Sequence, residues 1–222
     1  MEDRINYPEI VYFLRNTIKR ETGYLKELED FALKNHIPII QPESAAFIKT
    51  LVMLKRPQRI LEVGTAIGYS ATIMLEAMDK SGIIDTIEID EQIAEIAKRN
   101  IKKMGYDNRI RVIIGDASEV LECINSPYDL IFLDAAKGQY CEYLEHAVRL
   151  LRPEGLLLSD NVLYKGGVVQ GENAPHKHRT IAVNLKKYLY EICHDERLET
   201  SVIPIGDGMA ISLKKGELDE KD

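Results

Sequence analysis

The sequence predicts an α/β fold built on a mostly parallel β-sheet. From Arg59 onward, short apolar runs alternate with segments of helical periodicity, which is the pattern of successive strand–helix–strand units. Near the end of the chain, Glu199 to Pro204 and Met209 to Leu213 are two strand-like runs, and Asp207-Gly208 between them is a typical hairpin signal. An antiparallel pair is therefore expected to close the sheet.

The individual elements follow from the spacing of apolar residues. The predicted strands lie near residues 59–63, 83–89, 110–114, 128–133 and 155–159. The predicted helices of this alternating region lie near residues 69–79, 91–103, 117–124, 138–151 and 176–193. Ahead of them, apolar residues recur at helical spacing from Ile10 to Ile18 and from Tyr24 to Leu33, and Pro42 opens a third helix through Leu54. These three helices form a lead-in to the sheet.

Length and composition favour one cytoplasmic domain. The 222 residues can bury a full core, and 45% hydrophobic with 29% charged residues is typical of a globular protein. We expect a single domain over 1–222, with a helical lead-in over 1–56, a cofactor-binding core over 57–214 and a charged tail over 215–222. Residues 1–4 lack the apolar core of a secretion signal, and no apolar run is long enough to cross a membrane. The three cysteines share no metal-type spacing and are expected to be reduced thiols packed as small hydrophobes.

The net charge of −7 argues against a protein that coats nucleic acid, because such binding depends on Lys and Arg neutralising phosphates. Local basic contacts remain compatible with it. One basic cluster precedes Gly23 and another follows Asn161; their members are Arg15, Lys19 and Arg20, and Lys165, His176, Lys177, His178 and Arg179. Each cluster is either a contact surface for an anionic partner or a solvated charged face.

Two acidic sites end neighbouring apolar runs. Asp134 follows Phe132-Leu133, and Asp160-Asn161 follows Leu158-Ser159. Because the carboxyl ends of neighbouring strands form the ligand crevice of an open α/β sheet, we expect two carboxylates and an amide to meet there. Such hard oxygen ligands suit Mg²⁺ or Ca²⁺.

A glycine turn follows the first predicted strand and opens a helix, where α/β folds bind nucleotides. Its glycines, Gly64 and Gly68, have the spacing Gly-x-x-x-Gly, whereas a dinucleotide fingerprint needs Gly-x-Gly-x-x-Gly. The carboxylate of Glu62, directly before the turn, would also oppose a pyrophosphate. The ligand is therefore expected to carry a positive group.

Further acidic residues end the next strands. Glu88 lies 20 residues after Gly68, where a carboxylate can accept both ribose hydroxyls, and Asp116 follows the third strand. With Glu62 and Asp134 they suit S-adenosylmethionine, which offers a sulfonium, an ammonium, a ribose diol and an exocyclic amine. Any one of them could instead be a helix cap or a turn residue.

Residues from about 35 to 214 resemble the class I, S-adenosylmethionine-dependent O-methyltransferases of the catechol and caffeoyl-coenzyme A type. This resemblance implies a Rossmann-like, seven-stranded sheet, mostly parallel with a reversed C-terminal strand, and helices on both faces. Within that family, four motifs are most similar to the bacterial tRNA 5-hydroxyuridine methyltransferases, which form 5-methoxyuridine at the wobble position. These motifs are Gly64-Thr65-Ala66-Ile67-Gly68-Tyr69-Ser70, Asp134-Ala135-Ala136-Lys137-Gly138-Gln139-Tyr140, Asp160-Asn161-Val162-Leu163-Tyr164-Lys165-Gly166 and Pro204-Ile205-Gly206-Asp207-Gly208.

The resemblance also implies roles for individual residues. Glu88 would hold the ribose of S-adenosylmethionine, and Mg²⁺ would be bound by Asp134, Asp160 and Asn161. The other implied cofactor contacts are Ile40, Ser70, Asp116 and Ala117, of which Ile40 could equally be ordinary core. By the same analogy the enzyme is expected to be a homodimer whose N-terminal helices form the partner surface, with tRNA as its substrate.

One departure from the family bears on the substrate. The catechol enzymes carry a bulky aromatic residue after the metal aspartate, whereas this chain has Ala135-Ala136 there and no tryptophan anywhere. A tight catechol clamp is therefore not expected, and a larger substrate has room.

Methyl transfer is an in-line displacement that needs an aligned oxyanion. Lys137, three residues after Asp134, is the candidate general base or oxyanion partner, and the alternative is an ordinary surface lysine.

Three hypotheses about function follow: a tRNA wobble-uridine methyltransferase, a methyltransferase of small catechol-like phenols, and a nucleotide-binding or regulatory module without turnover. The metal motifs and Lys137 speak against the third. Motif similarity favours tRNA over phenols, while the negative net charge favours a small molecule.

Overall fold

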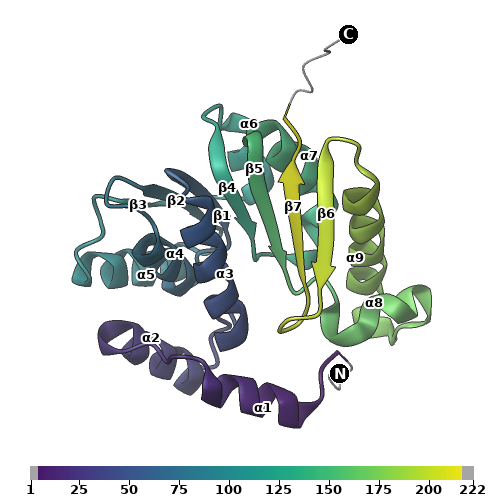
Figure 1. Cartoon of the computed structure of the whole chain (residues 1–222), viewed down its shortest axis with the longest axis horizontal. Coiled ribbons are helices and arrows are strands. Elements are labelled where there is room, and N and C mark those ends of the chain that lie inside the picture. Colours follow the sequence, from purple (N-terminus) through teal and green to yellow (C-terminus); the bar gives the residue numbers. More distant parts are fainter. Residues whose placement is uncertain (1–4, 217–222) are drawn as a thin grey trace. The chain divides into compact units, whose positions relative to one another are not determined.

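The computed structural model describes residues 5–216, which group into two compact units (Figure 1). The N-terminal unit runs from Tyr7 to Val120. The C-terminal unit begins at Leu121 and also takes in Asn6, whose side chain donates to the carbonyl of Gly206 at 3.2 Å. The predicted single domain stays a prediction, and its charged tail lies outside the described residues from position 217 on.

The N-terminal unit contains the three lead-in helices and three parallel strands in the order β3-β2-β1. All the predicted elements of this part of the chain are present, with ends shifted by at most two residues. They are α1 (Pro8–Thr17), α2 (Gly23–Lys34), α3 (Pro42–Lys55), β1 (Arg59–Val63), α4 (Tyr69–Ala77), β2 (Ile83–Glu88), α5 (Glu91–Lys103) and β3 (Ile110–Ile114), followed by α6 (Ala117–Cys123) at the end of the unit.

A buried carboxylate ties the three strands of this unit together. Asp85 on β2 is 5% exposed and accepts hydrogen bonds from Arg59 on β1 at 3.1 Å and from Arg111 on β3 at 2.8 Å. A buried charge without such partners would be strongly destabilising, so the pairing sets which strands can neighbour β2.

The C-terminal unit contains four strands in the order β4-β5-β7-β6. β4 and β5 are parallel, and β7 is antiparallel to both β5 and β6, so the predicted reversed strand is confirmed. It lies between β5 and β6, a place that the order of the chain does not reveal. The elements are β4 (Tyr128–Leu133), η1 (Lys137–Gln139), α7 (Tyr140–Leu150), β5 (Leu151–Asp160), η2 (Tyr164–Gly166), α8 (Gly167–Gln170), η3 (Gly171–Asn173), α9 (His176–His194), β6 (Leu198–Ile203) and β7 (Met209–Lys214).

Two parts of this unit differ from the sequence prediction. β5 begins at Leu151, four residues earlier than expected, directly where α7 ends. The short helical turns η2, α8 and η3 were not predicted, because their segment is rich in glycine and too short for a helical period to be recognised.

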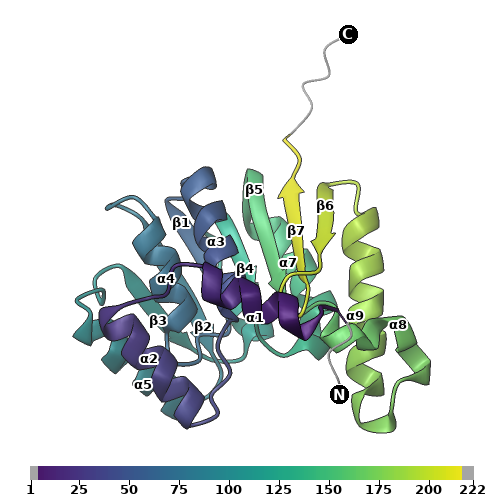
Figure 2. The same cartoon turned by 60° about the horizontal axis from the view of Figure 1, so that its bottom comes forward.

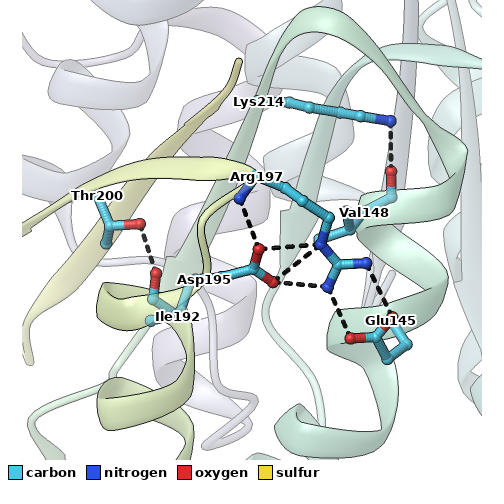
Figure 3. A network of polar contacts seen from close by, with 7 residues as sticks. All are labelled: Glu145, Val148, Ile192, Asp195, Arg197, Thr200 and Lys214. Atoms are coloured by element: carbon cyan, nitrogen blue, oxygen red, sulfur yellow. Dashed lines mark hydrogen bonds and ion pairs between the residues drawn. The ribbon is translucent and has the colours of Figure 1, made fainter. Parts of the chain in front are cut away.

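A polar network fastens the last two strands to the helices (Figure 3). The guanidinium of Arg197 bonds to Asp195 and to Glu145 of α7, and these hydrogen bonds lower the pKa of both carboxyl groups. Lys214, at the end of β7, donates to the carbonyls of Val148 and Leu151, where α7 has unsatisfied acceptors. β6 and β7 are thereby anchored at the end where the chain leaves the sheet.

The three cysteines are free thiols, but the expectation that they pack as small hydrophobes is wrong for two of them. Cys123 and Cys193 are exposed near the ends of α6 and α9, and Cys141 is half-buried. Within residues 5–216, none of the helices has both the length and the apolar character needed to cross a bilayer. The cytoplasmic location stays a prediction.

Candidate active site

The glycine turn of the N-terminal unit is pinned against the end of β2. The backbone N–H groups of Gly64 and Thr65 donate to the carbonyl of Ile87 at 3.0 and 3.1 Å. Gly68 has φ +83°, and a Cβ there would lie 3.3 Å from the side chain of Ile101 on α5. Glycine at this position therefore permits both the left-handed turn and the close approach of α4 to α5.

Glu62 is fully buried directly before this turn. Its two carboxylate oxygens accept hydrogen bonds from the hydroxyls of Ser70 and Thr86, each at 2.5 Å, and Thr86 also bonds Thr65 at 2.7 Å. The predicted residues Glu62 and Ser70 are thus brought together, and their contacts join β1, β2 and the start of α4. Their role toward a cofactor stays a prediction.

Glu88 lies beside the same turn. Its carboxylate accepts from the backbone N–H of Ala66 at 2.9 Å and from that of Asp90 at 3.1 Å. Hydrogen bonds from the buried Asn100 side chain to the carbonyl of Ile67, at 3.0 Å, hold the turn from the side of α5. This second support was not predicted, since Asn100 lies within an ordinary helical pattern.

The remaining predicted cofactor residues of this unit have simple local roles. Asp116 accepts from the backbone N–H of Ser118 at 2.8 Å and so caps the start of α6, the alternative anticipated from the sequence. Ala117 is the first residue of α6 and is buried, and Ile40 is buried just before α3. Contacts of these three residues with a cofactor stay predictions.

The C-terminal unit brings Asp134, Lys137, Asp160 and Asn161 together, and we call these four residues the acidic cluster. Leu133 of β4 is paired with Ser159 of β5, so Asp134 and Asp160 are the next residues on two neighbouring parallel strands. The Lys137 Nζ lies 3.6 Å from Asp134 Oδ1, with both side chains about three-quarters buried. The sequence prediction that strand ends bring the two aspartates together is confirmed for this pair.

Burial dominates the electrostatics of the acidic cluster. Asp160 is 1% exposed, and burial together with the negative charge of Asp134 raises the pKa of its carboxyl to about 7. Burial likewise raises the pKa of Asp134, against the opposing effect of the Lys137 charge. A nearby positive charge would therefore stabilise the charged forms of these two carboxyl groups.

The chain turns sharply after Asp160. The backbone N–H of Asn161 donates to Asp160 Oδ1 at 2.8 Å, and Asn161, Tyr164 and Lys165 all have left-handed backbones with φ between +49° and +56°. Non-glycine residues adopt such angles at a cost, and they persist where surrounding contacts impose them. This is a feature that the sequence did not predict.

The β6–β7 hairpin imposes that conformation. The carbonyls of Gly208 and Asp207 accept from the N–H groups of Val162 and Leu163 at 3.0 and 3.1 Å, and the Asp207 side chain accepts from the N–H of Lys165. A Cβ at Gly208 would lie 2.3 Å from Leu163 Cγ. The sequence predicted a hairpin here, but its use as the support of the Asp160-Asn161 turn depends on the tertiary fold.

Tyr140 is the polar residue at this site that sequence reasoning missed. It is 1% exposed, and its hydroxyl lies 3.0 Å from the carbonyl oxygen of Leu133 and 3.1 Å from that of Asp160. Burial raises its pKa far above the usual value, so the hydroxyl stays protonated and donates. Tyr140 ends the motif that begins at Asp134, but sequence reasoning assigned no role to its side chain.

Among residues 5–216, no three His, Cys, Asp or Glu side chains gather in a way that could hold a metal. The predicted metal ligands are two aspartates and the amide of an asparagine, a residue type that this finding does not cover. The metal site therefore stays a prediction.

A family model described as O-methyltransferase matches residues 15–215. The chain belongs to the O-methyltransferase family. A catechol O-methyltransferase of Niastella koreensis is 36% identical over 134 residues, which are 59% of this chain and 61%, less than two thirds, of that relative. A caffeoyl-CoA O-methyltransferase of Medicago sativa is 29% identical over 214 residues, covering 90% of this chain and 85% of the relative.

Solved structures of this family share the fold along the chain. The crystal structure of the O-methyltransferase of Bacillus cereus in complex with SAH has a TM-score of 0.82 and 25% identity, and the match covers 93% of this chain and 97% of that one. Such matches confirm the predicted fold class, a seven-stranded sheet with a reversed strand and helices on both sides. The predicted enzyme class, an S-adenosylmethionine-dependent O-methyltransferase, is also confirmed.

Replacing Glu88 with alanine is expected to weaken binding of S-adenosylmethionine by about 1.5–3 kcal/mol, because it removes a charge-assisted acceptor for the ribose diol. Titration calorimetry measures this loss. Glu91→Ala, an exposed change three residues away on α5, is the matched control and should bind normally. Wild-type affinity in a folded Glu88→Ala protein would remove Glu88 from the cofactor site.

Proposed function

We propose that this enzyme holds Mg²⁺ at Asp134, Asp160 and Asn161 and methylates the 5-hydroxyl of 5-hydroxyuridine at the wobble position of tRNA. The observation that carries the metal part is that two carboxylates lie at the ends of β4 and β5, that of Asp160 buried and that of Asp134 20% exposed. The substrate part depends on motif similarity and on the basic start of α9.

The acidic cluster fits a hard divalent cation. Carboxylate and amide oxygens are the ligands that Mg²⁺ takes in proteins. Burial raises the pKa of both aspartates, and the charge of Asp134 raises that of Asp160 further, so a nearby cation would stabilise their charged forms. Asn161 directly follows Asp160, in a turn that the hairpin supports, and its side-chain amide is proposed as the third ligand.

The residues of the chain then act by orientation and proton handling. When bound, S-adenosylmethionine supplies a methyl group on a sulfonium, and Mg²⁺ supplies Lewis acidity that favours a deprotonated substrate hydroxyl. Lys137 takes the proton of that hydroxyl or holds the resulting oxyanion through its ammonium group. Asp134 in turn orients Lys137, since their charged atoms lie 3.6 Å apart.

The start of α9 supports an anionic substrate. The first turn of a helix favours acidic side chains, yet α9 begins with His176, Lys177, His178 and Arg179 and has no acidic residue there. The side chains of Lys177 and Arg179 are exposed. Positive side chains at a helix N-terminus are suited to phosphate contacts, which would offset the overall negative charge of the chain.

A methyltransferase of small phenols is the second candidate. The names of the relatives from Niastella koreensis and Medicago sativa favour it. A catechol presents two adjacent oxygens, as the 5-hydroxyl and 4-carbonyl of 5-hydroxyuridine do, so the same metal ligands would serve either substrate. The small residues Ala135 and Ala136 after the metal aspartate favour the larger one.

We further propose a homodimer formed through α1. This helix has no buried residue, and four of its apolar side chains, together with Tyr7 just before it, are between 42% and 75% exposed; the four are Ile10, Tyr12, Phe13 and Leu14. Figure 2 shows the helix at the front of the view. Contiguous exposed apolar side chains of this kind mark an interaction surface.

Activity is expected to require a hard dication, and Asp160→Ala should lower turnover by about 100-fold or more while leaving affinity for S-adenosylmethionine intact. Mg²⁺ should raise the melting temperature of the wild type but not of this variant. Glu172→Ala, an exposed acidic change in η3, is the control. Full activity after exhaustive chelation would contradict the metal proposal.

The double change Lys177→Ala and Arg179→Ala is expected to weaken tRNA binding and to reduce the slope of log K against log salt by about 2, one for each lost phosphate contact. The same charge change on α5, Lys98→Ala with Arg99→Ala, is the control.

The choice of substrate is measured separately, by mass spectrometry of nucleosides after methyl transfer to tRNA from cells lacking this enzyme. Catechol is assayed in parallel. Turnover of catechol alone would replace tRNA by the second candidate.

Light scattering is expected to give the mass of two chains for the wild type and of one chain for Phe13→Glu, because a charge would be buried in the α1 interface. Tyr190→Glu, an equally exposed aromatic position on α9, should remain dimeric. A dimeric Phe13→Glu protein would exclude the α1 interface.

A further inference from the structure

We propose that Tyr140 is a positioning residue that sets the separation of the two metal-binding aspartates by joining the ends of β4 and β5. The inference depends on the proposed metal at Asp134 and Asp160.

The argument begins with the two acceptors. The Tyr140 hydroxyl lies within 3.1 Å of the carbonyl oxygens of both Leu133 and Asp160. The first carbonyl belongs to the peptide that leads into Asp134, and the second belongs to Asp160 itself. One side-chain oxygen is therefore in contact with the backbone of both strands at the residues that present the carboxylates.

These contacts lie where the pairing of the two strands ends. The ladder between β4 and β5 runs as far as Leu133 and Ser159, and Asp160 is then paired with Met209 of β7. Asp134 and Asp160 themselves are not paired with each other in this ladder. The Tyr140 hydroxyl takes over the connection at this point, since its proton can be shared between two carbonyls that would otherwise repel each other.

The ring of Tyr140 is held rigidly enough to act as a fixed point. It packs edge-on against Tyr188, with ring centroids 5.3 Å apart, and the Tyr188 hydroxyl bonds the Ser159 hydroxyl at 2.6 Å. Tyr140 and Tyr188 are both fully buried. Two tyrosines from α7 and α9 thus contact adjacent residues at the end of β5, and only Tyr140 also reaches β4.

A metal site needs its ligands at one separation, and partners outside the ligand set typically contribute about 10–100-fold to metal affinity. Without the hydroxyl, the two strand ends are free to spread, and the carboxylates can relax away from each other to reduce their repulsion. The expected consequence is weaker metal binding with an unchanged ligand set.

Tyr140→Phe tests this inference, because it removes only the hydroxyl and keeps the ring on Tyr188. Tyr143→Phe is the matched control: Tyr143 is a buried tyrosine on the same helix, but its hydroxyl donates to the side chain of Gln139. Binding of Mn²⁺ is measured by electron paramagnetic resonance in the presence of S-adenosylhomocysteine, and the Mg²⁺ activation curve is measured separately. Near-ultraviolet circular dichroism establishes that each variant is folded.

We expect Tyr140→Phe to bind Mn²⁺ about tenfold more weakly and to need proportionally more Mg²⁺ for half-maximal rate. At saturating Mg²⁺ the rate should recover. The affinity of this variant for S-adenosylmethionine should be normal. Tyr143→Phe should match the wild type in every measurement. Wild-type Mn²⁺ affinity in Tyr140→Phe, or an equal loss in Tyr143→Phe, would overturn the positioning role alone. Absence of Mn²⁺ binding by the wild type would overturn the metal proposal and this inference with it.

Discussion

The main constraint on the C-terminal unit is that two carboxylates, one buried and one largely buried, lie at the ends of neighbouring strands. Asp134 and Asp160 end neighbouring strands, and removing both from water disfavours their charged forms. The surrounding structure opposes that cost with the ammonium of Lys137 and the N–H of Asn161. It also keeps the two strand ends from separating, through Tyr140 on one side and the β6–β7 hairpin on the other. Apolar packing alone would not require these polar contacts around the two strand ends.

The carboxylates of the N-terminal unit are treated differently. Glu62 is as buried as Asp160, but hydroxyls of Ser70 and Thr86 donate to its two oxygens, and Glu88 accepts from two backbone N–H groups. Donors of the protein itself thus satisfy the carboxylate oxygens of both residues. The acidic cluster has fewer donors for its two charges, which is the physical ground for placing the cation there.

The same chemistry serves phenols and 5-hydroxyuridine, so the substrate must be distinguished by what surrounds the metal. Family membership establishes methyl transfer to oxygen and leaves the acceptor open. Two features of this chain bear on the acceptor: the alanines after Asp134, which leave space, and the basic first turn of α9, which attracts anions. Both are properties of the C-terminal unit, where the left-handed turn after Asp160 leads the chain toward α9.

The sequence by itself determined the alternation of strands and helices, the glycine turn, and the pairing of Asp134 with Asp160. Each of these depends on local periodicity or on the rule that parallel strands end at the same edge, and both are readable from residue spacing. Other features were decided only by tertiary structure. The position of β7 between β5 and β6, the support of the Asp160-Asn161 turn by Gly208, and the contact of Tyr140 with two strand ends all join residues at least seven positions apart in the chain. No local pattern encodes such contacts, because they depend on which elements become neighbours after the core has packed.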